Sequence, residues 1–246
     1  MSNDVFNVND LANVFTRLNM LIIGKKSHIK KYKKIRKLHG EVLDSMESYF
    51  FENRDTFRKY SNSLSGMVAR ETKVYNIVLN DNDEDDFSII SELFFYKTNN
   101  KFQSLTDLFI EKKKFKNKDK IKMLYSMKNS FVSLFKIVDV DFSEGYVTYQ
   151  DVFTNKKYKI IDISMSSTID FKKDKTYYVY NRIITYDDIS FGSGIHIMLR
   201  SDCKKLKEFL KKHKYNNCSD YSRCLQLYDI FKNSNEVSIN VNHNYN

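Results

Sequence analysis

The spacing of apolar residues changes along this chain, and that change restricts what the chain can fold into. Up to about residue 130, apolar residues recur every three or four positions, as in Ile29, Tyr32 and Ile35, which is the period of a helix with one buried face. Between residues 131 and 200, apolar and polar residues alternate instead, and turn signals such as "SEG" (143–145) separate the alternating runs. Helical spacing returns after residue 200. These patterns predict an α+β fold.

The alternating part predicts five short strands, at residues 133–142, 146–153, 158–164, 176–186 and 195–200, with a bend at 187–194. Strands at such regular spacing are typical of a small antiparallel barrel. The predicted organisation is a helical N-terminal region, a five-stranded antiparallel β-barrel-like module, C-terminal helices packed on the module, and a flexible polar tail, over residues 1–130, 131–200, 201–233 and 234–246.

Helices are expected at residues 6–23, 29–50, 53–79, 87–97, 104–113, 116–131, 204–215 and 220–233. Ser104 followed by Asp107 resembles a capping box at one of these starts. The acidic segment 80–86, "NDNDEDD", is expected to be a loop. Its acids and Glu92 partly match a calcium-loop pattern, but Asp86 stands where that loop needs glycine, so a solvated acidic loop is the preferred interpretation.

Three stretches carry a resemblance: "SLFKIVDV" (133–140), "DVF" (151–153) and "RII" (182–184). In their order over residues 88–200 they are similar to a group of uncharacterised bacterial proteins that often carry a SEC-C zinc motif. The resemblance implies the same small β-module, in under half of the chain, and no particular activity. The chain lacks the Cys-x-Cys and Cys-His cluster of that motif, so no zinc site is implied.

The basic residues favour polyanionic partners. The chain has 41 Lys and Arg against 31 Asp and Glu, a formal net charge of +10. Residues 25–37, "KKSHIKKYKKIRK", are the densest basic segment, and helical spacing places Lys30, Lys33, Lys34 and Lys37 on one outer face. Similar clusters follow at 112–122 and 204–214. The alternative is that the lysines reflect an A/T-rich genome, which the absence of proline also suggests.

The β-module adds a second candidate surface for nucleic acid. Lys156, Lys157 and Arg182 lie among its strands, together with tyrosines on which bases could stack: Tyr146, Tyr149, Tyr158, Tyr177, Tyr178 and Tyr180. The competing interpretation is that aromatic residues in strands form the core or cross-strand pairs.

Catalytic and metal-binding patterns are weak. The sequence has no nucleophile elbow, HExxH motif, Walker loop or dinucleotide fingerprint. Four acids on or beside strands, Asp139, Asp141, Asp151 and Asp162, leave a metal-dependent nuclease possible. Cys203, Cys218, Cys224 and His213 lack the close pairing of a zinc site. We therefore expect no catalytic residue, metal or cofactor.

Neither a secretory signal nor a transmembrane stretch is evident, and three late cysteines suggest reduced thiols. We expect a cytoplasmic protein without a membrane partner. The leading functional prediction is a non-enzymatic intracellular protein that binds nucleic acid or a nucleoprotein through basic helical faces. The alternative is a protein–protein adaptor or inhibitor from a phage or mobile element, and a metal-dependent nuclease is third. The oligomeric state stays open.

Overall fold

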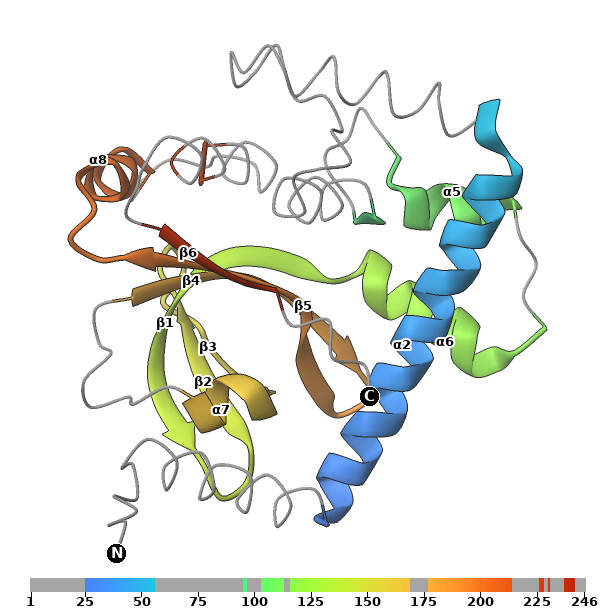
Figure 1. Cartoon of the computed structure of the whole chain (residues 1–246), viewed down its shortest axis with the longest axis horizontal. Coiled ribbons are helices and arrows are strands. Elements are labelled where there is room, and N and C mark those ends of the chain that lie inside the picture. The colour runs from blue at the N-terminus through green and yellow to red at the C-terminus, as the bar shows by residue number, and fades with distance from the viewer. Residues whose placement is uncertain are drawn as a thin grey trace, which may run out of the picture.

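The computed structural model describes residues 25–55, 95–96, 103–112, 116–168, 177–213, 226–227, 230 and 237–241. A strongly curved sheet is flanked by helices, and the α+β prediction is confirmed (Figure 1). The elements are α2 (Ser27–Glu52), α5 (Leu105–Lys112), α6 (Lys118–Lys128), β1 (Phe131–Asp141), β2 (Tyr146–Asp151), β3 (Lys157–Ile161), α7 (Ile163–Thr168), β4 (Tyr177–Tyr186), β5 (Ile189–Arg200), α8 (Lys204–His213) and β6 (Val237–Val241).

The first five strands close into a barrel. The sheet order is β3-β2-β1-β4-β5-β6, and a parallel pairing of Ile161 with Phe191 joins β3 to β5. Strand β1 is long enough to pair with β4 through its first half and with β2 through its second half. The closed order β1-β2-β3-β5-β4, with α7 between β3 and β4, is that of the oligonucleotide/oligosaccharide-binding (OB) fold. The expected five-stranded module is therefore present.

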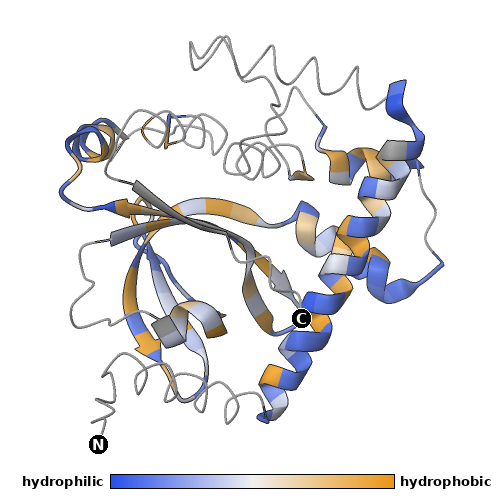
Figure 2. Ribbon diagram, in the orientation of Figure 1, coloured by the Kyte–Doolittle hydropathy of each residue, from blue (hydrophilic) through white to orange (hydrophobic). Residues whose placement is uncertain are grey.

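Alternation along the strands supplies two cores. Side chains on one face, such as Phe135, Tyr149 and Val179, fill the barrel interior. Their neighbours on the other face, such as Leu134 and Tyr180, pack under the helices in a larger core. Strand β1 is buried on both sides over residues 132–135 for this reason. Figure 2 shows hydrophobic and hydrophilic residues on α2 along its whole length, as expected for a helix with one buried face.

Local capping fixes where two helices begin. The backbone N–H of Asp107 donates to Ser104 Oγ at 3.1 Å, and the Ser104 N–H donates to Asp107 Oδ2 at 3.3 Å, so the predicted capping box is present. Asn117 accepts from the N–H groups of Asp119 and Lys120 at the start of α6.

The structure differs from the sequence prediction in two strands. The bend expected at 187–194 is wrong: only Asp187 and Asp188 turn, and β5 already begins at Ile189. Asp187 has a φ of 55°, a conformation that aspartate tolerates better than most residues. Strand β6 lies within the expected flexible tail and pairs antiparallel with β5, for example Ile239 with Ile197.

Several predicted segments lie wholly or mostly outside the described residues: the helices at 6–23, 53–79, 87–97 and 220–233, and the acidic loop 80–86. Within the part of the chain that is described, no helix has the length and apolar character needed to cross a membrane.

Candidate nucleic-acid interface

Helix α2 is held against the barrel by apolar residues of its inner face. Ile29, Ile35, Val42 and Met46 are buried at helical spacing. Arg36 lies on the same side, where it donates to the carbonyl oxygen of Gly192 at 2.7 Å. Its guanidinium carbon is 5.5 Å from the ring centre of Phe191. One member of the basic segment therefore contributes to the packing of α2 rather than to the surface.

Two further members of the segment pair with acids in barrel turns. Lys26 pairs with Glu144 in the β1–β2 turn (residues 142–145), and Lys31 pairs with Asp188 in the β4–β5 turn (residues 187–188). The hydrogen bond from Lys31 lowers the pKa of Asp188. From α6, Lys122 pairs with Asp187. Exposed pairs of this kind add little stability, but they neutralise the acids at this end of the barrel.

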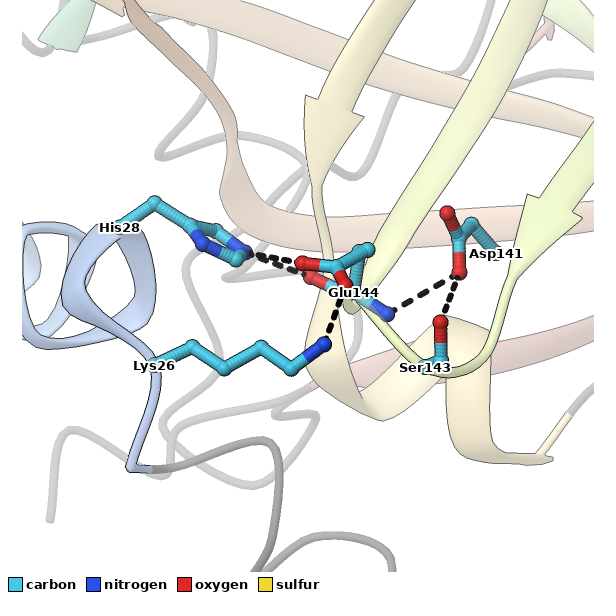
Figure 3. Close-up of polar contacts among 5 residues, drawn as sticks. All are labelled: Lys26, His28, Asp141, Ser143 and Glu144. Carbon is cyan, nitrogen blue, oxygen red and sulfur yellow. Dashed lines mark hydrogen bonds and ion pairs between the residues drawn. The ribbon is translucent and has the colours of Figure 1, made fainter.

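The contact between α2 and the β1–β2 turn is drawn in Figure 3. His28 Nε2 lies 2.9 Å from the backbone oxygen of Glu144, and because that oxygen only accepts, Nε2 must donate. The His28 ring also stacks on Tyr146, with centroids 5.3 Å apart. Asp141 accepts from Ser143 Oγ at 2.8 Å and from the Glu144 N–H at 3.0 Å, which lowers the Asp141 pKa. The β1–β2 turn is thus held by contacts with α2 and by hydrogen bonds within the turn itself.

The outer face of α2 contains the four lysines that the spacing singled out. Lys30, Lys33, Lys34 and Lys37 are all exposed. Their ammonium groups make no ion pair or hydrogen bond with any residue that the structure describes. The helix therefore separates its basic residues into an inner set that binds the barrel and an outer set that faces solvent.

A groove runs beside this outer face. It has a volume of about 370 Å³, and Lys31, Lys34 and Lys37 line it together with Tyr186. Glu41 and Asp119 also line it, so the groove is of mixed charge. The mainly basic surface is consequently the exposed face of α2 itself rather than the groove.

The charge of α2 changes sign along its length. Beyond the four lysines, Glu41, Asp44 and Glu47 follow, and the structure has no acidic residue in the first turn of α2 and no basic residue in its last. Partial burial, and then the charge of Asp44, raises the pKa of Glu47. This order opposes the helix macrodipole, which favours acids at the start and bases at the end. Helix stability alone does not account for the lysines.

The remaining predicted residues do not join this surface. Lys156 and Lys157 are exposed, but they lie at the end of the β2–β3 hairpin away from the β1–β2 turn. Arg182 is only 4% exposed. Its guanidinium carbon lies 4.1 Å from the Tyr96 ring centre, and it donates to Ser130 Oγ at 3.1 Å. Arg182 therefore belongs to the core and not to an exposed basic patch.

The tyrosines of the module are largely unavailable for stacking bases. Tyr149 and Tyr180 are buried, and Tyr158 packs on Phe131 with ring centroids 4.9 Å apart. Tyr146 lies against His28, with the Lys159 ammonium 4.3 Å from its ring centre. The exposed large aromatic residues within the described ranges are Tyr125 and Phe142, and neither was singled out from the sequence.

Three of the four strand acids bind backbone N–H groups. Asp151 accepts from Phe153 and Thr154 at 2.8 and 2.7 Å, and Asp162 accepts from Met165 at 2.9 Å. Asp141 does the same in the β1–β2 turn. Only Asp139 is exposed on a strand, and it pairs with Thr148 three positions along the ladder from Asp151. Asp141, Asp151 and Asp162 therefore serve three different parts of the backbone rather than one shared two-carboxylate metal site.

The described part of the chain also contains no group of three or more His, Cys, Asp or Glu side chains placed to hold a metal ion. Cys203 is a buried free thiol. Cys218 and Cys224 lie outside the described residues.

A family model described as a family of unknown function, DUF7986, matches residues 26–237, from the first ion pair of α2 to the start of β6, and the chain belongs to that family. No curated protein and no solved structure matches the chain.

Proposed function

We propose that this protein binds nucleic acid, free or within a nucleoprotein, through the outer face of α2. The observation that carries the proposal is the separation of charges on that helix. Lys26, Lys31 and Arg36 bind the barrel, whereas the four outer lysines have no acidic partner among the described residues. A rigid row of cations without partners can neutralise phosphates and release their counterions.

The barrel supports this proposal through its loops. OB barrels bind ligands with the strand 2–3 face and the β1–β2 and β4–β5 loops. In this chain α2 contacts both loops, through Glu144 and Asp188. The helix thus covers the acidic loop residues at one end of the barrel. The surface at that end is instead formed by the outer lysines of α2. The fold by itself does not establish a function, so the proposal rests on these residues.

The experiment is a fluorescence-anisotropy titration of generic single- and double-stranded DNA and RNA at two salt concentrations. We compare the parent protein with the double variant Lys33→Glu/Lys37→Glu. The matched control is Lys112→Glu/Lys116→Glu, which removes the same charge from exposed lysines elsewhere. Replacing two phosphate-binding lysines should weaken binding and reduce the salt slope by about 2.

Equal weakening by both double variants would refute a role for α2 and leave only net charge. No binding by the parent protein at low salt would refute nucleic-acid binding altogether and favour a protein partner. We propose the cytoplasm as the compartment, because the one described cysteine is a buried free thiol.

A further inference from the structure

Helix α8 carries a second basic face. Leu206 and Phe209 are buried, whereas Lys204, Lys207 and Lys211, at steps of three and four residues, are exposed on the other side. Their ammonium groups form no ion pair or hydrogen bond with the described residues. Glu208 is the one acid within the helix. This is the same separation into a buried apolar face and an exposed basic face that α2 shows.

The β2–β3 turn lies beside this helix. The rings of Phe153 and Phe209 meet edge to face with centroids 6.2 Å apart. The turn is fixed by Asp151, whose buried carboxylate binds two backbone N–H groups, and by Asn155 in the left-handed conformation. Lys156 in the turn and Lys157 at the start of β3, both exposed, therefore have a defined position near α8. We name the set the distal basic surface, made of Lys156, Lys157, Lys204, Lys207 and Lys211.

This surface is separate from the face of α2. In the β2–β3 ladder, Tyr146 pairs with Ile161 at the end that α2 contacts, and Gln150 pairs with Lys157 at the other end. Figure 1 shows α8 and the first half of α2 at opposite ends of the barrel. The ladder alone spans roughly 13 Å at about 3.3 Å per residue, and both helices extend beyond it.

We propose that the distal basic surface is a second nucleic-acid-binding surface, so that one molecule holds two separate nucleic-acid segments. The inference rests on the proposed function, because it assigns the same ligand class to a second place. Both surfaces are convex helix faces rich in lysine, which bind phosphates without reading the base sequence. The protein would therefore bridge two segments rather than recognise one site.

The test measures how many short duplexes one protein molecule binds. Native mass spectrometry, or sedimentation at low salt with saturating 8-base-pair DNA, should give two duplexes per protein. The variant Lys204→Glu/Lys207→Glu/Lys211→Glu should bind one. A control with the same charge change, Lys112→Glu/Lys116→Glu/Lys118→Glu, should still bind two. Glutamine versions at the α8 positions check that loss of binding does not come from misfolding.

The outcomes separate the two proposals. One duplex on the parent that the α8 variant also keeps, or two duplexes on the α8 variant, overturns the distal surface. If reversal at Lys33 and Lys37 has no effect while the α8 variant loses all binding, the role of α2 is refuted and the distal surface stands. If the α8 variant keeps one duplex and the further substitution of Lys33 and Lys37 removes it, both are supported.

Discussion

At the residue scale, aspartates at strand ends act mainly as backbone acceptors in this protein. Asp141, Asp151 and Asp162 each bind N–H groups that the strands leave unpaired. From sequence alone, such residues look the same as metal-binding acids beside strands. Only the local backbone geometry separates the two roles.

Asp151 provides a direct test of this structural role. The variant Asp151→Ala should lower the free energy of unfolding by about 1–3 kcal/mol, because two N–H groups lose their buried acceptor. Asp151→Asn, which keeps one carbonyl oxygen, should cost less. Urea denaturation measures both, with the exposed Asp139→Ala as control, expected within about 0.5 kcal/mol of the parent. Equal effects of Asp139→Ala and Asp151→Ala would contradict the assignment.

His39 is the second residue with a testable consequence. It is fully buried, its Nε2 lies 3.2 Å from the Tyr96 hydroxyl, and burial followed by the charge of Arg36 lowers its pKa to about 3. The unfolded chain takes up this proton near pH 6.5, and the folded protein does not. The free energy of unfolding should therefore fall as the pH decreases below 6.5, by about 2 kcal/mol between pH 7.5 and pH 5.

Urea denaturation at pH 7.5, 6 and 5 measures this dependence. The variant His39→Gln keeps a hydrogen-bonding group near Tyr96 but does not titrate, so its stability should change less over the same range. An identical pH dependence in the parent and in His39→Gln would show that other groups are responsible.

At the element scale, α2 places lysines where its own dipole disfavours them. The variant Lys30→Glu reverses one of these charges at the end of the first turn and puts a carboxylate four residues before Lys34, the favourable orientation for such a pair. We expect it to raise the free energy of unfolding by about 0.5–1 kcal/mol while weakening nucleic-acid binding. Thermal denaturation and anisotropy together measure the two effects.

The comparison variant is Lys112→Glu, because Lys112 lies in the last turn of α5, where a positive charge is favourable. The Lys112→Glu variant should be slightly less stable than the parent protein and should bind nucleic acid as tightly as the parent does. If Lys30→Glu lowers both stability and binding, the lysine serves the helix and not a ligand.

The sequence predicted the elements better than their contacts. Helical spacing correctly placed Ile29 and Ile35 inside, and alternation predicted the barrel strands. It did not predict β5 through Gly192 and Gly194, because glycines beside an Asp-Asp turn indicate a bend. Nor could it show that Lys26 pairs with Glu144, 118 residues away, since no local pattern records such a pair. The candidate site could be predicted as an exposed basic helix face, but the contacts of Lys26, Lys31 and Arg36 with the barrel could not.

At the scale of the whole molecule, β6 covers part of the edge of β5. It pairs with residues 195–199, which lie beyond the single β3–β5 bridge at Phe191. An uncovered strand edge is a template for pairing with another chain. A chain ending after residue 236 should therefore be less stable in urea and should self-associate in size-exclusion chromatography with light scattering. A chain ending after residue 241 is the control, and identical behaviour of the two would show that β6 is dispensable.

The contacts of α2 also set an order for synthesis on the ribosome. Lys31 cannot pair with Asp188 until another 157 residues have been synthesised, and Arg36 cannot bind Gly192 before that residue is made. At about 5–20 residues per second, that interval is on the order of 10 s. During it the helix has like charges at neighbouring turns and a charge order that opposes its dipole, so it is a poor helix in isolation. Nascent α2 is therefore expected to stay largely non-helical until the β4–β5 turn leaves the ribosome and completes the barrel surface against which α2 packs.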